Sequence, residues 1–190
     1  IIYTAIQKAY TGLFADRSVF DCVARNTRFE VVDTDSLVQI YGEPGRGLGG
    51  TLWDRQFNSF SQFVAADAAL PDIHIGYFSD SETFAGGYAN YGKVYTTVAA
   101  NGNHVWRGKF EITLNSAKLQ GEVSVASWAG LIAHEMLHNL GHAHPAASEV
   151  GLDAAYSGIY RINSVQSCVQ AAADGYPDHH ATEMRCGGRV

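Results

Sequence analysis

The stretch His134-Glu135-Met136-Leu137-His138-Asn139-Leu140-Gly141-His142-Ala143-His144 follows an apolar run from Val125 to Ala133, and we expect the fold to be built around it. An α-helix turns by about 100° per residue, so His134 and His138 fall about 40° apart and one turn along, where both imidazoles reach one metal ion. Glu135 lies between them in angle and can take a proton from water bound to that ion. The stretch therefore predicts a metal site at the end of a helix, with Glu135 as the catalytic base.

A third ligand is expected after the helix, because a catalytic zinc is held by three protein ligands and keeps its fourth position for water. In an unbroken helix His142 would stand about 12 Å from His134 along the axis, too far for nitrogens that bind zinc at about 2.0–2.1 Å. Gly141 can end the helix, since glycine enters the left-handed conformation without steric cost and turns the chain back. We therefore predict one catalytic Zn²⁺ bound by His134, His138 and His144. His142 is expected to be exposed or to lie just outside the ligand set.

Ordinary packed or surface histidines are the alternative interpretation of this stretch. Four histidines and a glutamate around a glycine are poor material for a hydrophobic core, so the metal site is favoured.

The composition is that of a globular protein, with 190 residues, 46% hydrophobic and 17% charged, which suits one domain with a sizeable core. A net charge of −6, with 13 basic residues that form no cluster, gives no electrostatic case for nucleic acid. No apolar run reaches the roughly 20 residues of a membrane span. Low charge and abundant glycine and tyrosine, together with the metal motif, favour a secreted, extracellular protein, which we expect to be a monomer.

Apolar periodicity predicts further helices and strands along the chain. Helical spacing is present at residues 1–14, 54–69 and 165–173, and strand patterns at 29–33, 73–78, 84–91, 93–98 and 110–115. Residues 93–98 are expected to continue the short edge strand before them.

The complete pattern H-E-x-x-H-x-x-G-x-x-H, with five fixed residues in eleven, is the metzincin signature, and residues 73–145 resemble the catalytic domain of the matrixins (matrix metalloproteinases). Residues 71–78 are similar to that family's central strand, 85–90 to its glycine-rich edge strand and 108–114 to the strand before the active helix. The resemblance implies an α+β fold with a twisted, mostly parallel five-stranded sheet packed on two long helices. It also implies a cleft above a smaller C-terminal subdomain.

The same resemblance implies a single catalytic domain over residues 1–190, divided into an N-terminal subdomain (1–141) and a C-terminal subdomain (142–190). An extended substrate would pair with the edge strand, so the implied substrate-binding residues are Gly86, Gly87, Tyr88, Ala89 and Asn90. The methionine of the family's turn beneath the zinc would be Met184, because Met136 lies inside the helix.

The loop at residues 79–84 departs from the matrixin pattern, because it lacks the histidine- and aspartate-rich segment that holds a structural zinc and calcium in that family. A structural zinc is therefore not expected. Bound Ca²⁺ stays an alternative through Asp80, Glu82, Asp33 or Asp35, although scattered surface carboxylates are more often solvated.

Three cysteines, Cys22, Cys168 and Cys186, permit at most one intramolecular disulfide. A bond between Cys168 and Cys186 is the favoured pairing, and three buried thiols are the alternative.

The expected function is a secreted zinc endopeptidase that hydrolyses peptide bonds of extended protein or peptide substrates by Glu135-assisted attack of water. One alternative is a metallopeptidase of narrow specificity that trims peptides. The other is a zinc-containing interaction or adhesion module. Glu135 argues against that module, because a structural zinc site needs no base and usually closes its fourth position.

Overall fold

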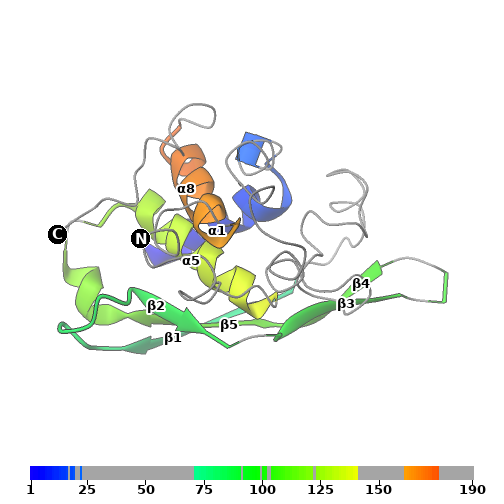
Figure 1. Ribbon diagram of the computed structural model, residues 1–190, viewed down its shortest axis with the longest axis horizontal. Helices are drawn as coiled ribbons and strands as arrows, with labels where there is room; N and C mark the ends of the chain where they lie inside the picture. Colours follow the sequence, from blue (N-terminus) through cyan, green and yellow to red (C-terminus); the bar gives the residue numbers. More distant parts are fainter. Residues whose placement is uncertain are drawn as a thin grey trace, which may run out of the picture.

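The computed structural model describes residues 1–16, 18, 19, 22, 71–90, 92–98, 100, 101, 104–121, 123–140 and 161–175. These residues form a mixed α+β structure in which helices α1 (Ile2–Phe14), α5 (Val125–Asn139) and α8 (Arg161–Ala173) lie on one side of the strands (Figure 1). The predicted strand at 29–33 and the predicted helix at 54–69 lie outside the described residues.

Three strands form the sheet that supports the helices. Strand β5 (Phe110–Asn115) is central, with β1 (Ile73–Phe78) parallel to it on one side and β2 (Gly87–Ala89) antiparallel to it on the other. Phe110, Ile112 and Leu114 alternate into the core, as a sheet buried on one face requires. The predicted strands at 73–78 and 110–115 are thus confirmed, and β2 is the edge strand expected within residues 84–91.

A second, two-stranded sheet contains β3 (Val94–Val98) and β4 (His104–Gly108), which pair antiparallel. The expectation that residues 93–98 continue the edge strand was wrong, and β4 was not predicted. Two glycines in the left-handed region mark the breaks, Gly92 (φ +67°) between β2 and β3 and Gly108 (φ +83°) between β4 and β5. A Cβ on Gly108 would lie 1.9 Å from the carbonyl oxygen of Lys93. Within the described residues the strands form two sheets with one parallel pair, so the mostly parallel five-stranded sheet is not confirmed.

Helix α5 is the central element of the core. Ser124 caps its N-terminus, with a hydroxyl that accepts a hydrogen bond from the Ser127 N–H at 3.0 Å. The helix contacts β2 and β5 on one side and α1 and α8 on the other. Helix α1 matches the predicted helix at 1–14, with Ala5, Ala9 and Leu13 fully buried. Helix α8 contains the predicted helical segment at 165–173.

Aromatic side chains fill the space between α1 and the strands. Phe14 meets Trp106 of β4 edge to face, with ring centroids 5.8 Å apart, and Tyr10 meets Phe110 of β5 in the same way at 5.9 Å. Such pairs contribute roughly 0.5–1.5 kcal/mol beyond the burial of their area. The aromatic cluster therefore holds the first helix against both sheets.

Helix α8 packs tightly against both other helices. A Cβ on Gly12 would lie 2.9 Å from Val169, and a Cβ on Gly130 would lie 2.7 Å from the carbonyl oxygen of Gln166. Next to these contacts, Cys168 forms a disulfide with Cys22, 146 residues away in the sequence. The favoured Cys168–Cys186 pairing was therefore wrong. The crossing of α8 over α1 directs Cys168 toward the chain just beyond α1, where Cys22 lies.

We expect peptide mapping without reduction to recover a fragment that joins Cys22 to Cys168. Replacing both by serine should lower the free energy of unfolding by about 2–5 kcal/mol, because the bond closes a long loop in the unfolded chain. Cys186→Ser is the matched control and should leave the joined fragment in place. Recovery of a fragment joining Cys168 to Cys186 would contradict the pairing.

Gly130→Ala should lower the melting temperature, because the carbonyl of Gln166 belongs to a helix and cannot swing away from an added Cβ. Overpacking of this kind costs about 1–3 kcal/mol, or several degrees in a chain of this size. The control is Gly121→Ala, where the nearest atoms would lie 3.8 Å from the new Cβ and little change is expected. Equal melting temperatures for the two variants would argue against the close crossing.

Candidate metal centre

The last two turns of α5 bring His134, Glu135 and His138 to one place. The ring centroids of the two histidines lie 5.1 Å apart, with an angle of 78° between the planes. With a zinc–nitrogen bond of about 2.0–2.1 Å, each centroid stands about 3.2 Å from the ion, and a tetrahedral angle separates two such centroids by about 5.2 Å. The predicted histidine pair therefore has the spacing that a single zinc ion requires.

The helix ends where the sequence predicted. Its last residue is Asn139, and the N–H of the capping residue Leu140 still donates to the carbonyl of Met136 at 3.0 Å. The chain thus leaves the helix directly before Gly141. Met136 is fully buried in the core, as expected for a methionine inside the helix.

Glu135 is the buried carboxylate of the site. Its side chain is only 4% exposed, and burial raises its pKa to about 7. Its Oε2 is buried and finds no hydrogen-bond partner among the described residues. Buried polar atoms are normally satisfied, so this oxygen calls for a water or a substrate group in the site. A carboxyl group that titrates near neutral pH is well suited to proton transfer.

A groove of about 370 Å³ runs between the edge strand and the helix. Its walls are residues 85–89 on one side and Leu131, His134, Glu135 and His138 on the other. Four of the five predicted substrate-binding residues, Gly86, Gly87, Tyr88 and Ala89, therefore line the groove together with the histidine pair and Glu135.

Asn90 is the exception among the predicted substrate-binding residues. It lies at a shallow hollow of about 230 Å³ that also contains His74 and Glu111, and it does not line the groove with the histidines. Its carbonyl oxygen accepts a hydrogen bond from the side chain of Asn139 at 2.7 Å. Asn90 therefore anchors the end of the edge strand.

Two glycines allow the edge strand to lie close against the helix. A Cβ on Gly86 would lie 2.8 Å from Leu131, and a Cβ on Gly87 would lie 3.0 Å from the carbonyl oxygen of Thr113 and 3.6 Å from Cγ of Glu135. A larger residue at position 87 would press on the Thr113 carbonyl and displace β2 from its place beside β5. Glycine at this position therefore allows the close approach of β2 to β5 next to Glu135.

His142, His144 and Met184 lie outside the described residues, so the third ligand and the methionine turn stay predictions. Over the described ranges alone, no group of three histidine, cysteine or acidic side chains is placed to hold a metal ion.

The calcium alternative also stays a prediction, because Asp33 and Asp35 lie outside the described residues. The side chain of Asp80 accepts hydrogen bonds from the backbone N–H groups of Glu82 and Thr83 at 2.8 and 3.2 Å, so it holds the turn of its own loop.

Sequence reasoning missed the wall residue Leu131 and two fully buried asparagines, Asn115 and Asn139. Asparagine is a poor residue for the interior of a helix or a strand. An asparagine at the last position of both the predicted strand and the predicted helix was the available sign that these side chains bond to neighbouring backbone.

No protein-family profile matches this chain, and comparisons with curated proteins and with solved structures gave no match. Among the described residues no helix is both long and apolar enough to cross a bilayer. A function has to be inferred from the residues and geometry of the site itself.

Proposed function

We propose that this chain is a zinc-dependent endopeptidase of the metzincin type, with His134, His138 and His144 as zinc ligands and Glu135 as general base. The observation that supports it most strongly is the placement of His134, Glu135 and His138 together in a groove under an edge strand. The proposal extends to the family's five-stranded sheet, to subdomains 1–141 and 142–190, and to Met184 as the residue beneath the zinc.

A bound zinc ion supplies a Lewis acid, which polarises the scissile carbonyl and lowers the pKa of water toward about 7. Glu135 accepts one proton from the attacking water as the new carbon–oxygen bond forms. It then delivers that proton to the leaving amine as the carbon–nitrogen bond breaks, so the reaction adds one water molecule and leaves the carboxylate unchanged.

Substrate binding follows from the edge position of β2. Only one side of β2 is paired within the described sheet, to β5, and the main-chain groups of an edge strand can bind an extended peptide. Gly86 to Ala89 would then fix the substrate backbone over Glu135. Recognition of this kind depends on the peptide backbone, so we propose broad tolerance for substrate sequence.

A secreted location is supported by the disulfide between Cys22 and Cys168. Disulfides persist in oxidising compartments and are rare in the cytosol. We therefore include extracellular action on protein or peptide substrates in the proposal.

The direct test is cleavage of a peptide library and of denatured casein, with and without a zinc chelator, followed by mass spectrometry of the fragments. We expect internal cuts that the chelator abolishes and added Zn²⁺ restores. Stepwise loss of terminal residues would indicate a trimming peptidase instead. Bound zinc without any cleavage would favour an interaction module and contradict the proposal.

Glu135→Ala should retain one zinc ion per chain and lose peptide hydrolysis by a factor of about 10² to 10⁴, because the ligands remain while the proton acceptor is removed. Metal content and turnover should be measured on the same preparation. Asp174→Asn, at an exposed position just after α8, is the control and should keep its activity. Near-normal turnover in Glu135→Ala would defeat the base assignment.

His144→Ala should reduce bound zinc far more than His142→Ala, because only position 144 can return to the ion after a bend at Gly141. The two variants differ by two positions in the chain and serve as controls for each other. Zinc analysis after dialysis gives the comparison. The reverse order would overturn the ligand assignment.

A further inference from the structure

Two fully buried asparagine side chains hold the two ends of edge strand β2. Asn115, the last residue of β5, donates from Nδ2 to the carbonyl oxygens of Asp80 at 2.7 Å and Ala85 at 3.1 Å. Its backbone N–H donates to the carbonyl of Gly86 at 2.8 Å. These bonds fix the chain where it enters β2.

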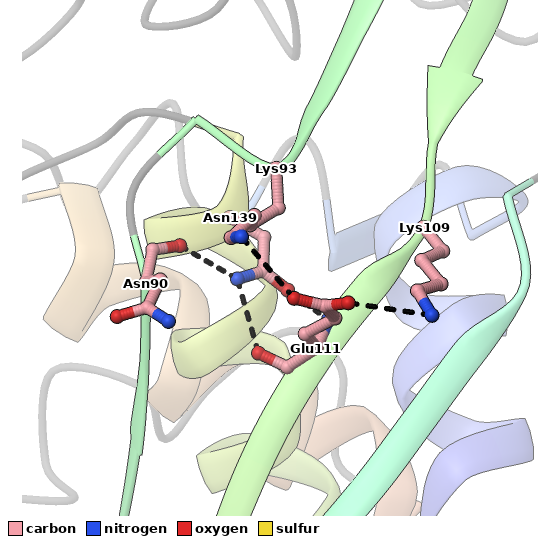
Figure 2. A network of polar contacts seen from close by, with 5 residues as sticks. All are labelled: Asn90, Lys93, Lys109, Glu111 and Asn139. Atoms are coloured by element: carbon pink, nitrogen blue, oxygen red, sulfur yellow. Dashed lines mark hydrogen bonds and ion pairs between the residues drawn. The ribbon is translucent and has the colours of Figure 1, made fainter.

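Asn139, the last residue of α5, fixes the other end. Its Nδ2 donates to the carbonyl oxygens of Asn90 at 2.7 Å and Glu111 at 3.2 Å, and its Oδ1 accepts from the Glu111 N–H at 2.7 Å (Figure 2). The side-chain amide of Asn139 therefore hydrogen-bonds to both main-chain groups of Glu111 in β5 and to the carbonyl of Asn90, just after β2. The helix, the central strand and the edge strand meet at this side chain.

This junction lies directly beside the metal-binding turn. Asn139 follows His138 in the sequence, and the carbonyl of His138 itself accepts from the Gly92 N–H at 3.4 Å. The last carbonyls of a helix have no partner within it, so the final turn is the part most prone to fray. The bonds from Asn139 to β5 and Asn90 hold that turn at a fixed distance from the strand.

The Glu111 side chain takes no part in this junction. Its carboxylate faces outward and lies 3.4 Å from Lys93 and 3.4 Å from Lys109, which lower its pKa (Figure 2). Exposed ion pairs of this kind add little stability. A change of the Glu111 side chain should therefore leave the backbone bonds of Asn139 in place.

We propose that Asn139 is a positioning residue, which sets edge strand β2 relative to the metal-binding turn of α5 through the carbonyl of Asn90 and the backbone of Glu111. The inference rests on the proposed function, in which β2 holds the substrate and His138 binds zinc. In this proposal Asn139 contacts neither the substrate nor the zinc ion, and it acts by positioning β2 and His138.

The test variant is Asn139→Asp, which keeps the shape and the acceptor for the Glu111 N–H but cannot donate to the two carbonyls. In the metal-free protein, amide exchange over residues 84–92 should quicken by about tenfold or more. Zinc affinity, measured by competition with a chelator, should fall by about tenfold, within the range known for groups that support metal ligands. In the zinc-loaded protein the KM for an extended peptide should rise more than kcat falls.

Two matched controls accompany this variant. Glu111→Gln removes the exposed ion pairs and should leave strand exchange and zinc affinity unchanged. Asn115→Asp should quicken exchange over residues 84–92 without lowering zinc affinity, because the side chain of Asn115 hydrogen-bonds to Asp80, Ala85 and Ala117, which lie outside α5. Asn139→Ser removes the same donors without burying a charge, carries the same expectation, and replaces Asn139→Asp if that variant does not fold.

A lower melting temperature with wild-type strand exchange and zinc affinity would mean a purely structural role for Asn139 and would overturn the inference. Equal loss of zinc affinity in Asn139→Asp and Asn115→Asp would overturn it as well. Failure of the proposed function has a different signature, in which the wild-type chain itself neither binds zinc nor cleaves peptides.

Discussion

The described part of the structure depends on one constraint: helix α5, which is packed on both sides, ends in polar side chains. Helix α5 contacts the sheet on one side and two helices on the other, yet its last two turns carry two imidazoles, a carboxylate and an amide. A buried carboxylate or amide costs free energy unless it finds a partner. Asn139 has its partners in the backbone of β5 and of Asn90, just after β2, whereas Oε2 of Glu135 has none among the described residues. That contrast separates a side chain that organises the fold from one that we propose as the catalytic base.

Glycines allow the helices and the edge strand to pack closely around α5. Gly12 and Gly130 let α8 cross α1 and α5 at short distance, and Gly87 lets the edge strand lie over Glu135. Burial of Glu135 raises the pKa of its carboxyl group. The raised pKa of Glu135 is therefore a consequence of its burial beside the edge strand.

Patterns of apolar residues in the sequence predicted the helices and strands whose formation depends mainly on their own residues. Apolar spacing predicted α1 and most of α8, the histidine motif after an apolar run predicted α5, and alternation predicted β1 and β5, since each pattern depends on residues within one element. The partner of Cys168 could not be found in this way, because Cys22 meets it only once α8 has crossed α1. The pairing of β3 with β4 likewise brings Gly108 against the backbone of Lys93, a close approach that an alternation pattern within one strand does not reveal. The histidine pair with Glu135 was predictable because the helix alone fixes its spacing.

Asn139 was missed because a polar residue beside a polar motif looks like part of a solvated helix end. In the structure it is fully buried, and its amide takes the place that a neighbouring strand would occupy against Glu111. The last turn of α5 thus presents two consecutive residues with separate tasks, since His138 faces the groove and Asn139 faces the sheet. Residues one apart on a helix point about 100° away from each other, so one turn can serve the site and anchor the strand at the same time. The distance between the proposed metal ligands and the strand over them is therefore fixed by a hydrogen-bonded side chain within the same helical turn.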